Sequence, residues 1–207
     1  EVIQGMGVPS LSRITPPTLG WDPKFYNTFG EYNPEKAKKL IKEAGYDGTP
    51  LVMHSSTSWL MQKEVAEIIA SMLESVGLKI DLRVMDVTTF REQVYYPYKN
   101  QDIYMDALGN SFFDPWIAVL SFRSDRRERT GWNDSYADKA DKLIRSAAVN
   151  MNPANRAAEY VELQNLINDE GPMVPLYQMK DAIRVNKKLK WDMPLDGFLW
   201  FGDATIY

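Results

Sequence analysis

The segment spanning residues 108–116, LGNSFFDPW, combines residue types that could hold a small molecule. Gly-Asn-Ser and Asp-Pro are unsuited to a core strand, and three large aromatic residues are unusual in a solvent loop. One interpretation is packing, in which at least one ring fills the space beneath the loop. The other is a ligand pocket, with an apolar wall of rings and hydrogen bonds from the polar residues. Its candidate residues are Leu108, Gly109, Asn110, Ser111, Phe112, Trp116 and Asp114, although Asp114 precedes a proline and is most simply a helix or turn cap.

A second segment of interest, residues 54–59, begins at the single histidine of the chain, His54. Ser55 and Trp59 are its candidate ligand contacts. A serine hydrolase could be drawn from Ser111, His54 and an aspartate. However, no serine lies in a G-x-S-x-G elbow, and a lone histidine at the end of a strand is more often structural. The hydrolase is the weaker alternative, and no catalytic residue is assigned.

Composition and missing motifs exclude several other classes of function. Cysteine is absent, and no H-E-x-x-H, EF-hand, P-loop or G-x-G-x-x-G pattern occurs, so we expect no metal site and no cofactor. The net charge of −4 argues against nucleic acid as a partner. No apolar run approaches the roughly 18 residues of a membrane span, so we expect no direct insertion of this segment into a membrane.

Alternating strand and helix patterns predict the elements that position the two segments. Strands are predicted over residues 51–54, 78–84 and 102–108, with helices over 60–76 and 88–95 between them. Strand–helix–strand crossovers of this length imply a largely parallel sheet in an α/β fold. Ligands of such sheets bind outside the carboxyl ends of the strands. Residues 54–59 and 108–116 both follow predicted strands, so we expect both at that rim.

Helix signals are strongest where an asparagine precedes a proline. Asn33-Pro34 begins a helix that ends at Gly45, and Asn152-Pro153 begins one that ends at Gly171. A further helix is predicted over residues 135–149, strand-like segments over 172–177 and 182–185, and an aromatic tail after them. The expected buried faces are Ala37, Leu40, Ile41 and Ala44; Val65, Ile68, Ile69, Met72, Leu73 and Val76; Ala140, Leu143, Ile144 and Ala147; and Ala157, Tyr160, Val161, Gln164 and Ile167.

The first residues, EVIQGMGVPS, contain no initiator methionine and no signal-peptide pattern. Val2, Ile3 and Met6 have the spacing of a helical face that ends at the following glycine and proline residues. This pattern predicts the last turns of a helix that begins upstream, so we expect the chain to be a piece of a longer protein. Residues 8–33 have no sustained periodicity and are expected to form an irregular connection.

Several motifs together resemble one known family. They are YNPEKAKKLIKEAGYDG, the helix and strand EVAEIIASMLESVGLKIDLRVMD, the later FDPW, and NPANRAAEYVELQNLINDEGPMVPLY. In this order they resemble the solute-binding proteins of bacterial ABC importers of the dipeptide, oligopeptide and nickel class (family 5). The resemblance implies a lobe of the periplasmic-binding-protein type II fold, with a mixed, mostly parallel sheet flanked by helices. It also implies three parts: a connection from a missing N-terminal lobe (1–33), a ligand-binding lobe (34–180), and a strand and tail returning toward the missing lobe (181–207).

The resemblance further implies a function. The protein would be monomeric and non-enzymatic, and would capture a peptide-like, opine, oligosaccharide or other polar solute by closure of two lobes. It would deliver the solute to the transmembrane permease subunits of an ABC importer, from the periplasm or as a membrane-anchored lipoprotein. A ligand-sensing lobe of a signalling system is the alternative of the same fold.

The resemblance also bears on the ligand. Peptide-binding members carry an acidic residue three positions before the place of Asp114, where it pairs with the α-amino group of the ligand. Here that place is Ser111, and an aromatic residue three positions earlier is replaced by Leu108. A neutral hydroxyl cannot supply the charge-assisted bond that an ammonium group needs, which favours a solute other than a simple peptide. A compensating acid would be Asp106 or Asp114, and Asn133 is a further candidate contact or a cap.

Overall fold

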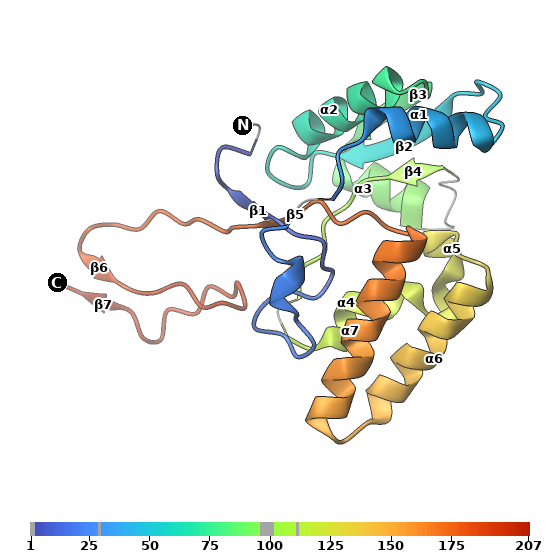
Figure 1. The fold of residues 1–207 in the computed structure, drawn as a ribbon. Coiled ribbons are helices and arrows are strands. Elements are labelled where there is room, and N and C mark those ends of the chain that lie inside the picture. Colours follow the sequence, from blue (N-terminus) through green and yellow to red (C-terminus); the bar gives the residue numbers. More distant parts are fainter. Residues whose placement is uncertain (1–2, 29, 96–101, 111) are drawn as a thin grey trace. The chain divides into compact units, whose positions relative to one another are not determined.

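The computed structural model describes residues 3–28, 30–95, 102–110 and 112–207 (Figure 1). The chain divides into two compact units. Unit 1 comprises Glu1–Gly5 and Gly30–Ala107, and unit 2 comprises Met6–Phe29 and Leu108–Tyr207. Ser111, one of the predicted ligand contacts, lies outside the described residues.

Unit 1 is built on a parallel sheet, as the crossovers predict. Its strand order is β3–β2–β4, with β2 at Leu51–Ser56, β3 at Ile80–Met85 and β4 at Ile103–Tyr104. Helices α1 (Pro34–Glu43), α2 (Gln62–Ser75) and α3 (Val87–Phe90) surround the sheet, and α3 continues into the π-helical turn η2 (Arg91–Tyr95). In Figure 1, α2 lies above the sheet and α3 lies below it.

The core of unit 1 forms between β2 and α2. Met53, whose register partners are Leu82 on β3 and Ile103 on β4, packs with Ala66 and Ala70 of α2. The small alanine side chains let the helix approach the sheet closely, and Met53 is fully buried beneath them. This alanine face differs from the predicted one: Ile69 packs on the core, but Ile68 and Met72 are exposed. Because the apolar stripe of α2 is wide, the pattern alone did not select the side that faces the sheet.

Helix α1 begins and ends where the sequence predicts. Asn33 accepts a hydrogen bond from the backbone N–H of Lys36 (2.9 Å), Pro34 occupies the first turn, and Gly45 has a positive φ of 69°. Its predicted buried face is wrong for this chain, since no residue of α1 is buried and Leu40 is 54% exposed. The helix therefore depends on its caps and its surface ion pairs more than on packing.

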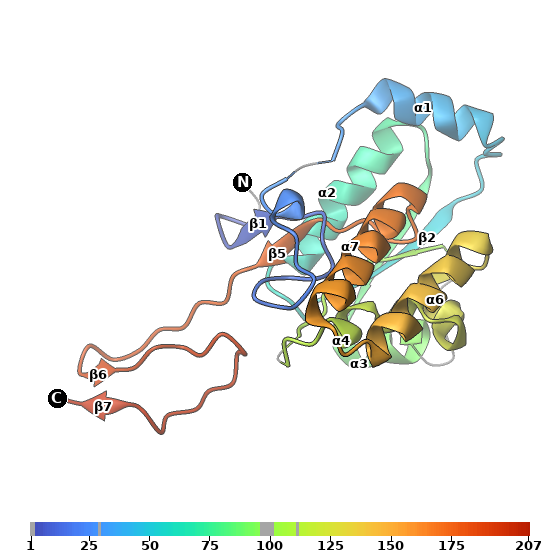
Figure 2. The ribbon, with the colours of Figure 1, turned by 60° about the horizontal axis from the view of Figure 1, so that its bottom comes forward.

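Unit 2 is centred on the antiparallel helices α6 (Ser135–Val149) and α7 (Pro153–Glu170), shown in yellow and orange in Figures 1 and 2. Three shorter helical elements contact α6: α4 (Pro115–Val119), η3 (Leu120–Phe122) and η4 (Ser124–Arg126). Unit 2 also contains α5 (Arg127–Thr130), which contacts η3 and η4, and η1 (Pro23–Phe25). The predicted faces are confirmed at Ala140, Ile144 and Ala147 of α6 and at Tyr160, Gln164 and Ile167 of α7, all of which are buried. Val119, Phe122 and Trp132 complete this core.

The connecting segment before α1 is fixed on α7. Gln164, a buried residue of α7, accepts a hydrogen bond from the hydroxyl of Ser12 and donates one from Nε2 to the carbonyl of Gly20 (2.8 Å). Asn168 donates to the carbonyl of Leu11 (2.9 Å). Gly20 has a positive φ of 80°, and a Cβ at this position would come within 2.7 Å of the Tyr160 side chain. The segment is irregular, as predicted, but its course is set by side chains of α7.

Three small strand features differ from the sequence prediction. The strand predicted over 102–108 is limited to β4, because the last sheet bond runs from Met105 N–H to the carbonyl of His54. The strand predicted over 172–177 is displaced to β5 (Tyr177–Met179), which pairs antiparallel with β1 (Gly7–Pro9); Pro172 and Pro175 have no N–H to donate. Residues 182–185 form no strand, and the tail instead pairs β6 (Leu189–Lys190) with β7 (Thr205–Ile206). Residues 3–6, predicted as the end of a helix, form a turn and a bend.

Candidate functional site

In unit 1, the loop after β2 is held by the side chain of Gln62 at the start of α2. The Oε1 atom of Gln62 accepts hydrogen bonds from the Ser56 hydroxyl (3.0 Å) and from the Trp59 N–H (3.3 Å). Its Nε2 atom donates to the carbonyl of Met105, just beyond β4 (3.0 Å). Gln62 is buried, so this network joins the carboxyl ends of β2 and β4 in a fixed arrangement.

The predicted contacts in this loop differ in accessibility. Trp59 is 43% exposed, so its ring is available to a ligand. Ser55 is fully buried, and its hydroxyl has no hydrogen-bond partner among the described residues. His54 is also buried and lies within β2, in agreement with a structural role.

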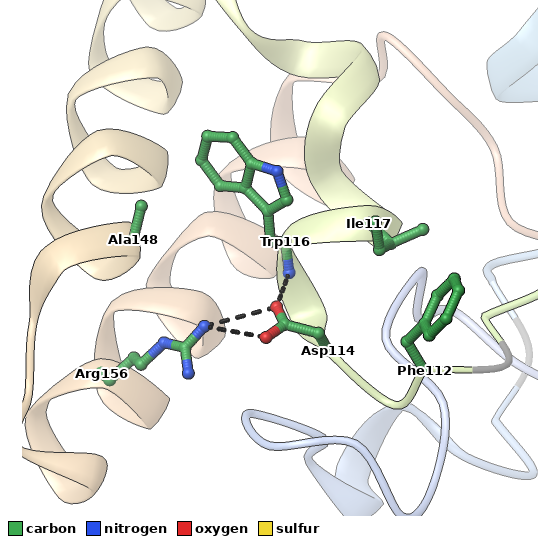
Figure 3. A pocket seen from close by; sticks show the side chains of 6 residues that line it. All are labelled: Phe112, Asp114, Trp116, Ile117, Ala148 and Arg156. Atoms are coloured by element: carbon green, nitrogen blue, oxygen red, sulfur yellow. Dashed lines mark hydrogen bonds and ion pairs between the residues drawn. The ribbon is translucent and has the colours of Figure 1, made fainter.

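In unit 2, a pocket of about 320 Å³ opens between α4 and the end of the α6–α7 hairpin (Figure 3). Three of the residues that line it come from the predicted segment: Phe112, Asp114 and Trp116. The other three are Ile117 of α4, Ala148 of α6 and Arg156 of α7. The pocket therefore combines apolar and aromatic walls with one acidic and one basic group.

Asp114 has two structural contacts in this pocket. Its Oδ1 atom accepts a hydrogen bond from the Trp116 N–H (2.8 Å), so it is the N-cap of α4, as the Asp-Pro pair predicts. Both carboxylate oxygens also lie near Nη2 of Arg156, at 3.3 and 3.4 Å. The carboxylate is thus already paired with a cation in the same unit. Asp106, the other candidate acid, accepts a hydrogen bond from the Tyr95 hydroxyl in unit 1.

Arg156 contacts three different elements. Its Nε atom donates to the carbonyl of Ala147 in the last turn of α6 (3.0 Å), and its Nη2 atom reaches Asp114 at the start of α4. Its guanidinium carbon lies 5.7 Å from the centre of the Tyr160 ring, one turn along α7. Burial raises the pKa of the Tyr160 hydroxyl above its ordinary value. Tyr160 therefore stays neutral beneath Arg156.

The remaining predicted contacts lie around this pocket or away from it. Phe112 is 75% exposed, and Leu108 and Gly109 are exposed as well. Asn110 is half-buried and donates from Nδ2 to the carbonyl of Asp114 (3.0 Å), while its Oδ1 atom has no partner among the described residues. Asn133 is exposed, and the residue that caps α6 is its neighbour Asp134.

Sequence reasoning missed Gln62 and Arg156. One signal for Arg156 was available: it stands in the first turns of a helix, where a positive charge is unfavourable to the helix dipole unless a carboxylate lies nearby. That signal points to an acidic partner but not to Asp114, which is 42 residues away in the chain. Within the described residues, no group of acidic or histidine side chains has the arrangement of a metal site. No helix in the same residues is long and apolar enough to cross a membrane.

Residues 1–130 match the family model described as "Bacterial extracellular solute-binding proteins, family 5 Middle". The chain belongs to this family. The family consists of binding proteins, which favours solute binding over the hydrolase alternative. Among curated relatives, the glutathione-binding protein GsiB of Escherichia coli (strain K12) is 27% identical over an alignment of 202 residues that covers 93% of this chain and 39% of the relative. GsiB of Salmonella typhi is 26% identical over the same coverage.

Solved structures of this type share the fold. The structure of HbpA2 from Haemophilus parasuis matches with a TM-score of 0.78 and 20% identity, over 100% of this chain and 41% of that one. AgaA, solved with agropinic acid, matches with a TM-score of 0.69 and 22% identity over 86% of this chain and 36% of that one. The chain thus spans about two fifths of the length of the proteins that it matches.

Proposed function

We propose that this chain is part of the substrate-binding component of an ABC-type importer. The observation that carries the proposal is the family match over residues 1–130, together with an α/β unit whose fold agrees with solved binding proteins. The complete protein would enclose a polar solute between two lobes and present it to the transmembrane permease subunits. It would act outside the cytoplasm, in the periplasm or as a membrane-anchored lipoprotein.

The proposed solute contacts are assigned separately in the two units. In unit 1 they are Ser55 and Trp59, of which the exposed Trp59 ring is the stronger candidate. In unit 2 they are Leu108, Gly109, Asn110, Ser111, Phe112, Asp114, Trp116 and Asn133. Phe112 is the strongest of this set, because a 75% exposed phenylalanine ring offers a large apolar surface to a bound molecule.

The pairing of Asp114 with Arg156 favours a solute that is not held through a free ammonium group at this position. The carboxylate of Asp114 already faces a cation and caps α4, so an ammonium would have to share it with Arg156. Asp106 accepts a hydrogen bond from the Tyr95 hydroxyl, a neutral donor that does not compensate its charge. Related proteins carry names or bound ligands that include the peptides STSA and Met-Leu, glutathione, agropinic acid and stachyose. We propose a solute of the opine, sugar or modified-peptide kind for this chain.

The experiment is the identification of solutes that co-purify with the full-length protein. Small molecules released from the purified protein by denaturation are identified by mass spectrometry and then tested by thermal shift. The panel includes free di- and tripeptides beside their N-acetylated forms. Stabilisation by free peptides but not by acetylated ones would overturn the proposed ligand class, and no stabilisation by any co-purified solute would overturn the binding function.

We further propose that residues 181–207 pack against a part of the protein outside this chain. The tail forms the two-stranded hairpin β6–β7, and an isolated hairpin of this size is marginally stable in water. It exposes many large apolar side chains: Leu195, Phe198, Leu199, Trp200, Phe201, Ile206 and Tyr207. Contiguous apolar surface of this kind marks an interaction site. Acrylamide should quench Trp200 less in the full-length protein than in residues 1–207, and equal quenching would contradict the proposal.

A further inference from the structure

The loop that precedes α4 contains a strained residue. Phe113 has a φ of +50°, in the left-handed region that is unfavourable for a bulky aromatic residue. Its N–H closes a turn by donating to the carbonyl of Asn110 (3.3 Å). Such a conformation persists only where the surroundings hold it, and it is common beside ligand sites. The neighbouring Phe112 is the most exposed of the aromatic candidate contacts in unit 2.

The contacts that hold this turn converge on Asp114. Its carbonyl accepts the side-chain N–H of Asn110, and its carboxylate accepts the N–H of Trp116. These bonds connect the turn to the first turn of α4, which is held in the core of unit 2 by the buried Pro115, Ala118 and Val119. The Asp114 carboxylate has a second contact beyond α4, with Arg156 of α7.

Arg156 is held on the α6–α7 hairpin. Its side chain is 24% exposed, and Nε is held by the carbonyl of Ala147, a buried residue at the end of α6. That carbonyl belongs to the last turn of α6, where the helix itself leaves carbonyls unpaired. Figure 3 shows the guanidinium between the α6–α7 hairpin and Asp114, with Nη2 directed at the carboxylate. The guanidinium therefore joins the α6–α7 hairpin to the strained turn.

We propose that Arg156 is a positioning residue that fixes the turn closed by the Phe113 N–H and the Asn110 carbonyl, and thereby the direction of Phe112. The importance of Phe112 for a solute rests on the proposed function, whereas the fixation of the turn does not. Lysine cannot replace arginine here, because a single ammonium cannot donate to Ala147 and Asp114 in the planar geometry of a guanidinium. We predict that replacement of Arg156 loosens the turn while the α6–α7 hairpin remains intact.

The test is hydrogen–deuterium exchange of the full-length protein in the wild type and in the variants Arg156→Met, Arg156→Lys and Lys139→Met. Lys139 is the matched control, because its ion pair with Glu162 (3.0 Å) joins the same two helices without a contact to the turn. In Arg156→Met, the hydrogen-bonded amides of Phe113, Trp116 and Ile117 should exchange about tenfold faster, while those of Leu163 and Ile144 change less than about twofold. The exchange rates of the turn amides in Arg156→Lys should lie between those of the wild type and Arg156→Met. Lys139→Met should leave these rates unchanged.

A second readout follows the ring of Phe112 by fluorine NMR after incorporation of 4-fluorophenylalanine. The wild type should give one sharp resonance for Phe112, and Arg156→Met should broaden or split it. Unchanged exchange and an unchanged resonance in Arg156→Met would overturn the proposal. So would equal acceleration of the turn and of the hairpin core, since that result means general destabilisation. Neither readout uses a solute, so a failed search for a ligand leaves this test intact.

Discussion

Replacement of Asp114 separates its two contacts and gives the most informative stability measurement. Asp114→Asn keeps an oxygen that can accept from the Trp116 N–H but removes the charge facing Arg156. The ion pair is long, at 3.3 Å, and its side chains are 43% and 24% exposed, so we expect a loss of about 0.5–1 kcal/mol in the free energy of unfolding. Asp114→Ala also removes the helix cap, which adds about 1 kcal/mol.

Asp134 is the matched control for this measurement. It caps α6 by accepting from the N–H groups of Tyr136 and Ala137, and no ion pair of Asp134 occurs among the described residues. Asp134→Ala should therefore lower the free energy of unfolding by about 1 kcal/mol, and Asp134→Asn should lower it by less than about 0.5 kcal/mol. The assay is urea denaturation followed by tryptophan fluorescence, since every tryptophan except Trp59 lies in unit 2. Equal losses for Asp114→Asn and Asp134→Asn would refute the energetic role of Arg156.

Three further predictions concern buried or capping residues that support the two units. Gln164→Leu leaves the carbonyl of Gly20 buried without its donor and should cost about 2 kcal/mol in urea denaturation. Tyr160→Phe removes a buried hydroxyl that has no partner among the described residues, so stability at neutral pH should change by less than about 1 kcal/mol. Because burial raises the Tyr160 pKa, the wild type should also lose stability as pH rises past the ordinary tyrosine value, and the variant should lose less. The hydrogen bond from the Thr89 hydroxyl lowers the pKa of Asp86. Ionised Asp86 therefore stabilises the fold above the ordinary aspartate pKa, and this stabilisation is lost as the pH falls below that value. In a pH series of thermal unfolding, Asp86→Asn should reduce the loss of stability at acidic pH.

Local signals in the sequence predicted the helices of this chain well. The asparagine caps at Asn33 and Asn152 and the glycine at Gly171 act within one turn of the chain, so their effect does not depend on tertiary structure. The parallel sheet of unit 1 was also predictable, because a strand–helix–strand sequence of this length leaves few other arrangements.

Packing and pairing between distant residues were less predictable. The sequence does not say which side of the wide apolar stripe of α2 faces Met53, and two alanines rather than the larger residues make that contact. Strand β5 pairs with β1 across most of the chain, so its register depends on contacts that no local pattern records. The pairing of Arg156 with Asp114 has the same origin, since only the fold of unit 2 brings the start of α7 to the start of α4.

Asp114 in unit 2 has structural contacts that limit its proposed role as a partner for a ligand. Asp114 caps α4, anchors the turn through Asn110 and pairs with Arg156. The carboxylate is shared between the helix cap and the Arg156 guanidinium, so a ligand ammonium that drew it away would weaken both contacts. The described part of the loop therefore offers an exposed aromatic ring and backbone groups, but no uncommitted negative charge. On the proposed function, that combination is suited to a solute recognised by its apolar faces and its hydrogen bonds.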